Sequence, residues 1–222
     1  MTDSIPFIDF GGNGRILHFA HPNAYPPAGF RQFLQPLTAD YHVYAIKHRP
    51  LWPGSRPEEM TGWRIIADDL IRFFDEMGWQ QVIGMGHSLG AVATLYAAVS
   101  RPDLFSQLIL IEPVMLPPAI LQKIAENPEA PAFGQMVDGA LKRRTRWASR
   151  EAAFERFRRK SVFRRFSDEA LWDYVNSATR KADNGSVELV FPREWEARFY
   201  SMPPFHVWQA IEQLTQPTLA IR

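Results

Sequence analysis

The sequence predicts an α/β fold: a three-layer α/β/α sandwich with a mostly parallel sheet and an inserted helical segment. Three observations support this class. Apolar runs of strand length alternate with helical patterns in the first half of the chain, as in parallel sheets that are covered on both faces. Charged helical stretches then replace the alternation, which returns only at residues 217–221. A Gly-Xaa-Ser-Xaa-Gly motif also joins one predicted strand to the next predicted helix.

The first predicted strands lie on either side of a glycine-rich turn. Residues 5–10 and 15–20 have strand patterns, and the turn between them predicts a hairpin. A Pro-rich loop leads into a short predicted helix over residues 30–37, and the next strand covers residues 41–46. These segments account for the first part of the predicted sheet.

The next elements follow the order helix, strand, helix, strand. Apolar residues at helical spacing predict a helix over residues 63–77, which ends at Gly78. An apolar strand over residues 81–85, an Ala-rich helix over 91–98 and a strand over 108–111 come after it. Ligands of open parallel sheets bind at the carboxyl ends of the strands, so we expect the loops after these strands to share one site.

We expect the chain to have three parts. Residues 1–114 form the first part of the core, residues 115–206 form a helical cap, and residues 207–222 return to the core and leave it incomplete. Proline pairs near both ends of the middle part are typical of the edges of an inserted domain.

The composition excludes several classes of function. The chain has 222 residues, a hydrophobic fraction of 46% and a formal net charge of +1, so nothing in its overall charge favours nucleic acid or an acidic membrane surface as a partner. It has no cysteine, which excludes disulfides, thiolate nucleophiles and Cys-ligated metals. We recognise no signal peptide and no bilayer-spanning run. We therefore expect a cytoplasmic protein with no cofactor, no metal, and no membrane or nucleic-acid partner.

The candidate functional motif is Gly86-His87-Ser88-Leu89-Gly90. A serine with glycines two residues before and after it, between a strand and a helix, has the pattern of a nucleophile elbow, in which a strained turn exposes the serine hydroxyl. The motif has only three fixed positions and therefore also occurs by chance in unrelated chains. The flanking strand and helix favour the functional interpretation, in which Ser88 is the nucleophile.

With these motifs, the whole chain resembles the capped serine hydrolases of the α/β-hydrolase superfamily. The resemblance covers the His21-Pro22-Asn23 loop, the Ser88 elbow, the strand before Glu112, the helical middle part and the returning strand. It implies that the backbone N–H groups of Asn23 and Leu89 are the oxyanion donors. It also implies acyl transfer on a small to medium, partly apolar ester or related carbonyl compound. Carbon–carbon bond hydrolysis on the same fold, or a noncatalytic binding protein that lacks a complete triad, is the alternative.

The acid and the base are the open parts of this interpretation. Glu112 follows a strand where some members of the family place the catalytic acid, but a strand-end carboxylate held by local backbone donors is the more common case. In the family the histidine base follows the last strand of the sheet, so the resemblance implies a base beyond Arg222. Three explanations remain: a longer natural chain, a truncated inactive protein, or substitution by His206. We favour the first of these.

Basic residues are concentrated in the expected cap. Residues 142–165 include eleven lysines and arginines but only two acids, Glu151 and Glu155. This run either attracts an anionic small-molecule substrate or is a solvated helix face, which is the more common arrangement of such residues.

Overall fold

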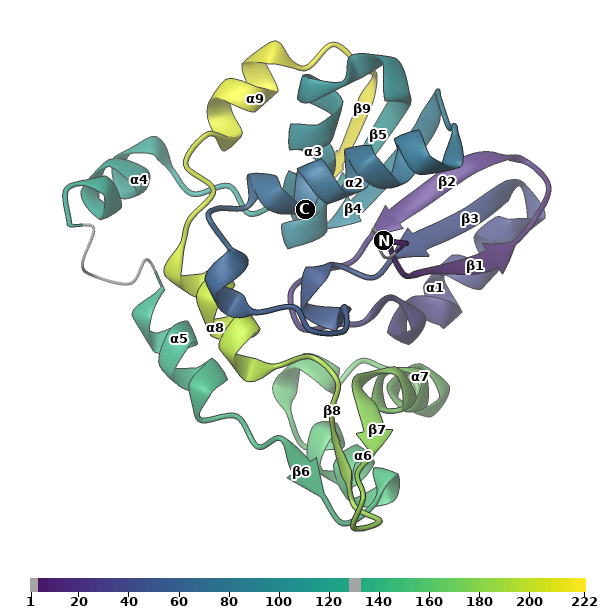
Figure 1. Ribbon diagram of the computed structural model, residues 1–222, viewed down its shortest axis with the longest axis vertical. Coiled ribbons are helices and arrows are strands. Elements are labelled where there is room, and N and C mark those ends of the chain that lie inside the picture. The colour runs from purple at the N-terminus through teal and green to yellow at the C-terminus, as the bar shows by residue number, and fades with distance from the viewer. Residues whose placement is uncertain (1–3, 128–132) are drawn as a thin grey trace.

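The computed structural model describes residues 4–127 and 133–222. A six-stranded sheet with the order β1-β3-β2-β4-β5-β9 forms its centre (Figure 1). The strands are β1 (Phe7–Gly11), β2 (Arg15–Ala20), β3 (Tyr41–Ile46), β4 (Val82–His87), β5 (Phe105–Ile111) and β9 (Thr218–Ile221). Every neighbouring pair is parallel except β1 with β3. The predicted α/β sandwich with a mostly parallel sheet is confirmed.

The predicted hairpin between the first two strands is wrong. β1 pairs antiparallel with β3, while β2 lies between β3 and β4 and is parallel to both. The burial patterns give the reason, because four consecutive residues of β2, 17–20, are buried, as in an interior strand with both faces covered. In β1 no residue is fully buried, and Phe7 is exposed, so that this strand occupies the edge. The glycine-rich turn predicted the wrong strand pairing because the apolar residues of β2 are buried between two other strands.

Helices cover both faces of the sheet. On one face lie α2 (Arg64–Met77), α3 (Leu89–Ser100) and α9 (Val207–Gln213), and on the other lies α1 (Arg31–Leu34) with the short turns beside it. The short 3₁₀ segments are η1 (Pro27–Phe30), η2 (Gln35–Ala39), η3 (Arg49–Leu51), η4 (Pro57–Glu59), η5 (Pro102–Leu104) and η6 (Ser161–Phe163). Helix α2 ends at Gly78, whose φ of 66° gives the left-handed cap that favours glycine, at the predicted position.

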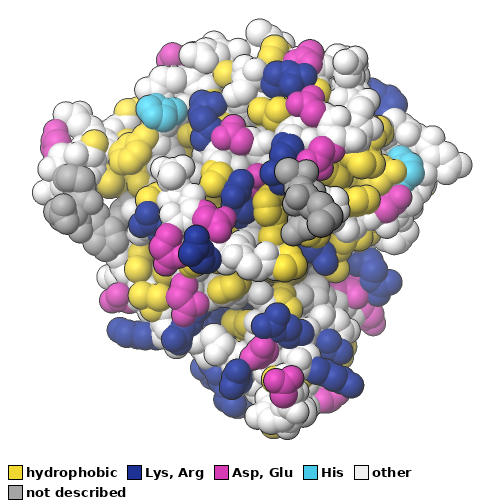
Figure 2. Space-filling view, viewed as in Figure 1, with side chains coloured by type: hydrophobic (Ala, Val, Ile, Leu, Met, Phe, Trp, Pro, Cys, Tyr) yellow, Lys and Arg dark blue, Asp and Glu magenta, His cyan; other side chains and the backbone are white. Residues whose placement is uncertain are grey.

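The segment between β5 and α9, here called the β5–α9 segment, has a different architecture. Its elements are α4 (Pro118–Ala125), α5 (Gly134–Leu141), β6 (Arg146–Trp147), α6 (Arg150–Arg158), α7 (Asp168–Ala178), β7 (Thr179–Lys181), β8 (Val187–Leu189) and α8 (Arg193–Ser201). Three of them form a small antiparallel sheet, β6-β8-β7, which the charged helical pattern did not predict. Many lysine and arginine side chains lie on this lower part of the molecule (Figure 2).

The β5–α9 segment has its own apolar core. Aromatic side chains from α6, α7 and the turn between them pack together, with Phe157, Phe163 and Tyr174 almost fully buried. Tyr25, from the loop after β2, packs against this cluster. Trp195 and Phe199 of α8 belong instead to the main core beside α2 and α3. The two cores are therefore joined through the loop after β2 and through α8.

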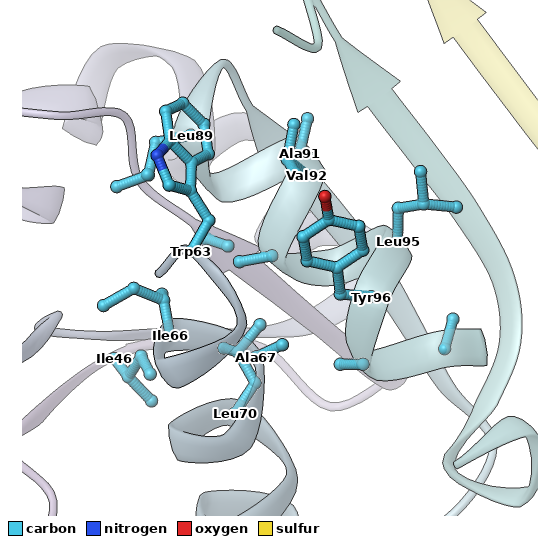
Figure 3. Close-up of a cluster of buried hydrophobic side chains, with 14 of the residues drawn as sticks. Ile46, Trp63, Ile66, Ala67, Leu70, Leu89, Ala91, Val92, Leu95 and Tyr96 are labelled. Atoms are coloured by element: carbon cyan, nitrogen blue, oxygen red, sulfur yellow. The ribbon is translucent and has the colours of Figure 1, made fainter. Parts of the chain in front are cut away.

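Helix α3 packs directly on the strands beneath it. It shares a buried cluster with α2, in which Leu89, Val92 and Tyr96 lie near Trp63 and Ile66 (Figure 3). Its first turn approaches the sheet so closely that a Cβ on Gly90 would lie 2.0 Å from the carbonyl oxygen of Ala20 in β2. Only glycine permits this distance, because the atom that it would meet is backbone and cannot turn aside.

We expect Gly90→Ala to lower the free energy of unfolding by more than about 3 kcal/mol, because the new methyl group forces α3 away from β2. Urea unfolding followed by circular dichroism measures this change. Gly139→Ala is the matched control, since Gly139 also lies in a helix, and a Cβ there meets nothing within 4 Å. That substitution should stabilise the protein by up to about 1 kcal/mol. Equal effects of the two substitutions would contradict the close contact.

Candidate functional site

Ser88 lies in a strained turn between β4 and α3. Its φ of 54° and ψ of −115° place it in a region that residues with a side chain rarely adopt. The Ser88 N–H donates to the carbonyl oxygen of Ile111 at 2.9 Å, and the Ser88 carbonyl accepts from the Val92 N–H at 3.3 Å. The turn is therefore fixed to β5 on one side and to α3 on the other. This local geometry is the one that the motif predicted.

A cavity of about 440 Å³ opens in front of Ser88. Its walls come from the loop after β2, the Ser88 turn, the chain before α2 and the β5–α9 segment. The lining is mainly aromatic and aliphatic: Pro22, Asn23, Tyr25, Phe30, Trp63, His87, Ser88, Leu89, Val114, Phe133, Met136, Val162, Phe166 and Tyr200. A cavity of this size, mainly apolar and with a few polar groups in its wall, suits a small, partly apolar molecule.

Asn23 and Leu89, the two predicted oxyanion donors, both line this cavity together with Ser88. Leu89 is the first residue of α3, and its N–H is one of the helix-terminal N–H groups that have no acceptor within the helix. The Asn23 side chain donates through Nδ2 to the carbonyl oxygen of Glu196 in α8 at 3.2 Å. The loop after β2 is thereby attached to the β5–α9 segment.

Buried histidines hold the same loop from behind. His21 accepts the N–H of His48 through Nε2 at 3.0 Å, and its Nδ1 lies 2.9 Å from the Pro22 carbonyl oxygen. The His48 Nε2 lies 3.0 Å from the His21 carbonyl oxygen. His18 accepts the Ile46 N–H through Nε2 at 3.2 Å. Each bond to an N–H requires an unprotonated ring nitrogen, so this arrangement fixes neutral tautomers.

Burial keeps these rings neutral. Removal from water lowers the pKa of His21 to about 4, against the smaller opposing effect of its backbone partners. Burial, and then the neighbouring His21, lowers the pKa of His18 to about 3. The pKa of His48 is lowered well below its usual value for the same first cause. None of the three rings lines the cavity at Ser88, so their role is to support the backbone behind it.

Glu112, the predicted acid, lies at the end of β5 in a left-handed conformation with a φ of 45°. Its side chain is exposed and does not line the cavity, and its N–H donates to the Ile221 carbonyl oxygen at 2.8 Å. His87 does line the cavity; burial lowers its pKa, and the charge of Glu112 partly offsets this shift. The structure thus brings Glu112 near His87 at the rim of the site.

The structure pairs no histidine with Ser88 among the residues that it describes. Within 4–127 and 133–222, no histidine ring makes a hydrogen bond to the Ser88 hydroxyl. His206, the alternative base, is exposed at the start of α9 and does not line the cavity.

Two aromatic residues from outside the Ser88 motif also line the cavity, and no sequence signal indicated Trp63. Trp63 precedes α2 and is held by a hydrogen bond from its Nε1 to the Met202 carbonyl oxygen at 2.6 Å. Tyr200 comes from α8, and burial raises its pKa to about 12, so it remains a neutral hydroxyl. Neither residue lies in a recognisable sequence motif. The packing of α8 against the core brings both of them to the cavity at Ser88.

Neither a metal site nor a membrane-spanning helix is found in the described part of the chain. It contains no group of three or more His, Cys, Asp and Glu side chains placed to hold a metal ion. Likewise, none of its helices has the length and apolar character needed to cross a bilayer.

Comparison with known sequences finds a matching family and several relatives. The model of the alpha/beta hydrolase family matches residues 18–219. A strigolactone esterase from Arabidopsis thaliana is 32% identical over 107 residues, which are 46% of this chain and 39% of that protein. A probable esterase from Oryza sativa subsp. japonica is 29% identical over 45% of this chain and 38% of its own length. The chain therefore matches less than half the length of these curated relatives.

Solved structures share the fold. E-2-(acetamidomethylene)succinate hydrolase superposes with a TM-score of 0.72 at 19% identity, covering 97% of this chain and 75% of that one. An esterase from Mycobacterium tuberculosis gives a TM-score of 0.71 at 20% identity, covering 99% of this chain and 71% of the other.

We expect the free energy of unfolding to fall by more than about 1 kcal/mol between pH 7.5 and pH 5. The unfolded histidines bind protons below about pH 6.5, whereas His18 and His21 in the folded state do so only near pH 3 and 4. Stability is therefore present above pH 6.5 and is lost as the pH falls toward 4. Urea unfolding at several pH values measures the slope.

Two variants test the origin of this slope. His18→Gln should reduce it, because the amide oxygen can still accept the Ile46 N–H but does not titrate. His21→Gln should also reduce it, because its amide oxygen can accept the His48 N–H in place of the ring nitrogen but does not titrate. A slope that His18→Gln does not change would contradict a contribution from this buried ring.

Proposed function

The chain belongs to the alpha/beta hydrolase family, and we propose that it is a serine hydrolase with Ser88 as its nucleophile. The observation that carries this proposal is the strained Ser88 turn on the wall of an apolar cavity, next to unsatisfied N–H groups at the start of α3. Strain at such a turn persists only where the surrounding structure enforces it, and it commonly marks a functional site. The curated relatives described as esterases support ester hydrolysis in particular.

The proposed reaction is acyl transfer from a small to medium, partly apolar ester. The Ser88 oxygen attacks the carbonyl carbon while its proton passes to a base, and the tetrahedral intermediate then expels the alcohol, which takes that proton. Water attacks the resulting acyl-serine, releases the acid and restores the hydroxyl. The backbone N–H groups of Asn23 and Leu89 stabilise the oxyanion, a contribution typically worth on the order of a hundredfold to a thousandfold in rate for each donor.

We propose that the base is a histidine outside residues 1–222. Its absence at Ser88 among the described residues supports this proposal, as does the greater length of the matched solved structures. Glu112 is proposed as the acid that orients this histidine, from its place at the carboxyl end of the strand beside β4. The β5–α9 segment is proposed as the cap, because Phe133, Met136 and Tyr200 close the cavity opposite Ser88.

We call the natural protein that includes the proposed histidine the intact protein. In it, we expect Ser88→Ala to abolish labelling by a fluorophosphonate probe and to reduce hydrolysis of p-nitrophenyl butyrate by at least about 10⁴-fold. The substitution removes the only atom that the proposed reaction joins to the acyl group. In-gel fluorescence measures labelling, and absorbance measures turnover.

Ser106→Ala serves as the control, since Ser106 lies in β5 and does not line the cavity. It should label and turn over like the unsubstituted protein. Turnover that survives Ser88→Ala would contradict the proposed nucleophile. An intact protein that neither labels nor turns over any ester would instead favour a noncatalytic binding protein.

A further inference from the structure

A second cavity of about 360 Å³ adjoins the one at Ser88. The two cavities share four lining residues, Tyr25, Met136, Val162 and Tyr200, so they lie next to each other. The remaining walls of the second cavity come from the β5–α9 segment, mainly the end of α5, the chain before β6, and α6.

The two cavities differ in charge. No charged side chain except the titratable His87 lines the first, whereas Lys142, Arg143, Arg144, Arg156 and Lys160 all line the second. The only acid in its wall, Glu196, is bound by Arg143 with an Nη1 to Oε2 distance of 2.6 Å. The other four cations form no ion pair with any residue in 4–127 and 133–222.

Buried groups in the same wall also favour an anion. The Nε of Arg143 and the Nε1 of Trp147 are buried donors that have no acceptor among the described residues. Burial lowers the pKa of the Lys160 ammonium, and the charges of Arg143 and Arg156 lower it further. Lys142, Arg144 and Arg156 are exposed, but Arg143 and Lys160 are half-buried, and cations held together partly away from water are costly unless a negative charge compensates them.

We propose that the second cavity binds an anionic group, a carboxylate or a phosphate, at the far end of the acyl substrate whose scissile bond lies at Ser88. This inference rests on the proposed function and narrows its substrate class to esters with an apolar middle and a charged end. In this proposal the apolar middle lies in the first cavity and the charged end in the second, and Tyr25 and Tyr200 line both. The basic run therefore has two parts: some cations line the second cavity, and others, such as Arg164, do not.

Three p-nitrophenyl esters with chains of equal length test the proposal: one ends in a carboxylate, one in a phosphate and one in a methyl group. We expect the intact protein to favour at least one anionic ester by about tenfold or more in kcat/KM, mainly through KM. The two anionic arms distinguish carboxylate from phosphate. Equal kcat/KM for all three esters would overturn the proposal.

Two substitutions locate the effect. Lys160→Gln and Arg156→Gln should each reduce the preference severalfold with little change for the neutral ester, because each removes a cation from the wall. Arg164→Gln removes an equal charge from the same basic run without touching either cavity and should leave the preference unchanged. If all three substitutions act equally, the effect is general attraction by the surface charge, and the proposal fails.

Binding without turnover separates this proposal from the proposed function. Calorimetry measures suberate, a dicarboxylate, against 1,8-octanediol, a neutral molecule of the same length, with the Ser88→Ala protein. Tight suberate binding that Lys160→Gln weakens supports the anion site even if no ester is hydrolysed. Equal affinity for the two molecules, or affinity that Lys160→Gln and Arg156→Gln leave unchanged, overturns it. Arg156 is exposed on α6, so its substitution tests the site even if Lys160→Gln impairs folding.

Discussion

The contact between the first turn of α3 and the backbone of β2 is the constraint on which the site depends. Gly90 meets the Ala20 carbonyl, and Gly86 in β4 lies against the Gly90 carbonyl, where a Cβ would approach to 2.4 Å. Because neither neighbour can move without breaking the sheet, the residue between them is held in its strained conformation. The energy for this strain comes from the large apolar cluster that α3 shares with α2. The position of Ser88 is thus a property of the whole core.

The loop that faces Ser88 is held by a different principle. Its support is polar, consisting of histidines that are buried, neutral and bonded in defined tautomers to the backbone of neighbouring segments. Apolar packing alone would leave the N–H groups of Ile46 and His48 without acceptors, at a typical cost of about 1–3 kcal/mol each. The two sides of the first cavity are therefore stabilised in different ways. The Ser88 side depends on the packing of α3 against the sheet, and the loop side depends on hydrogen bonds with the buried histidines.

Local sequence signals predicted the elements nearest to Ser88 well. The apolar run before it, the small residues after it and the stop at Gly78 all correspond to the observed strand and helices. The same kind of signal failed for β1 and β2, because pairing partners depend on which strand must be buried. Trp63 and the second cavity were also out of reach, since they arise where distant segments meet. The basic run was visible in the sequence, but which of its cations line the second cavity depends on the packing of α5, α6 and α8.

Glu196 connects these parts in a way that no single motif reveals. Its carbonyl oxygen accepts the Asn23 side chain of the loop beside Ser88, and its carboxylate accepts Arg143 in the wall of the second cavity, which in turn donates to Tyr174. Glu196 thus bonds to residues in the walls of both cavities. A displacement of α8 therefore affects both cavities. A substitution that moves this helix and changes the shape of one cavity also changes the shape of the other.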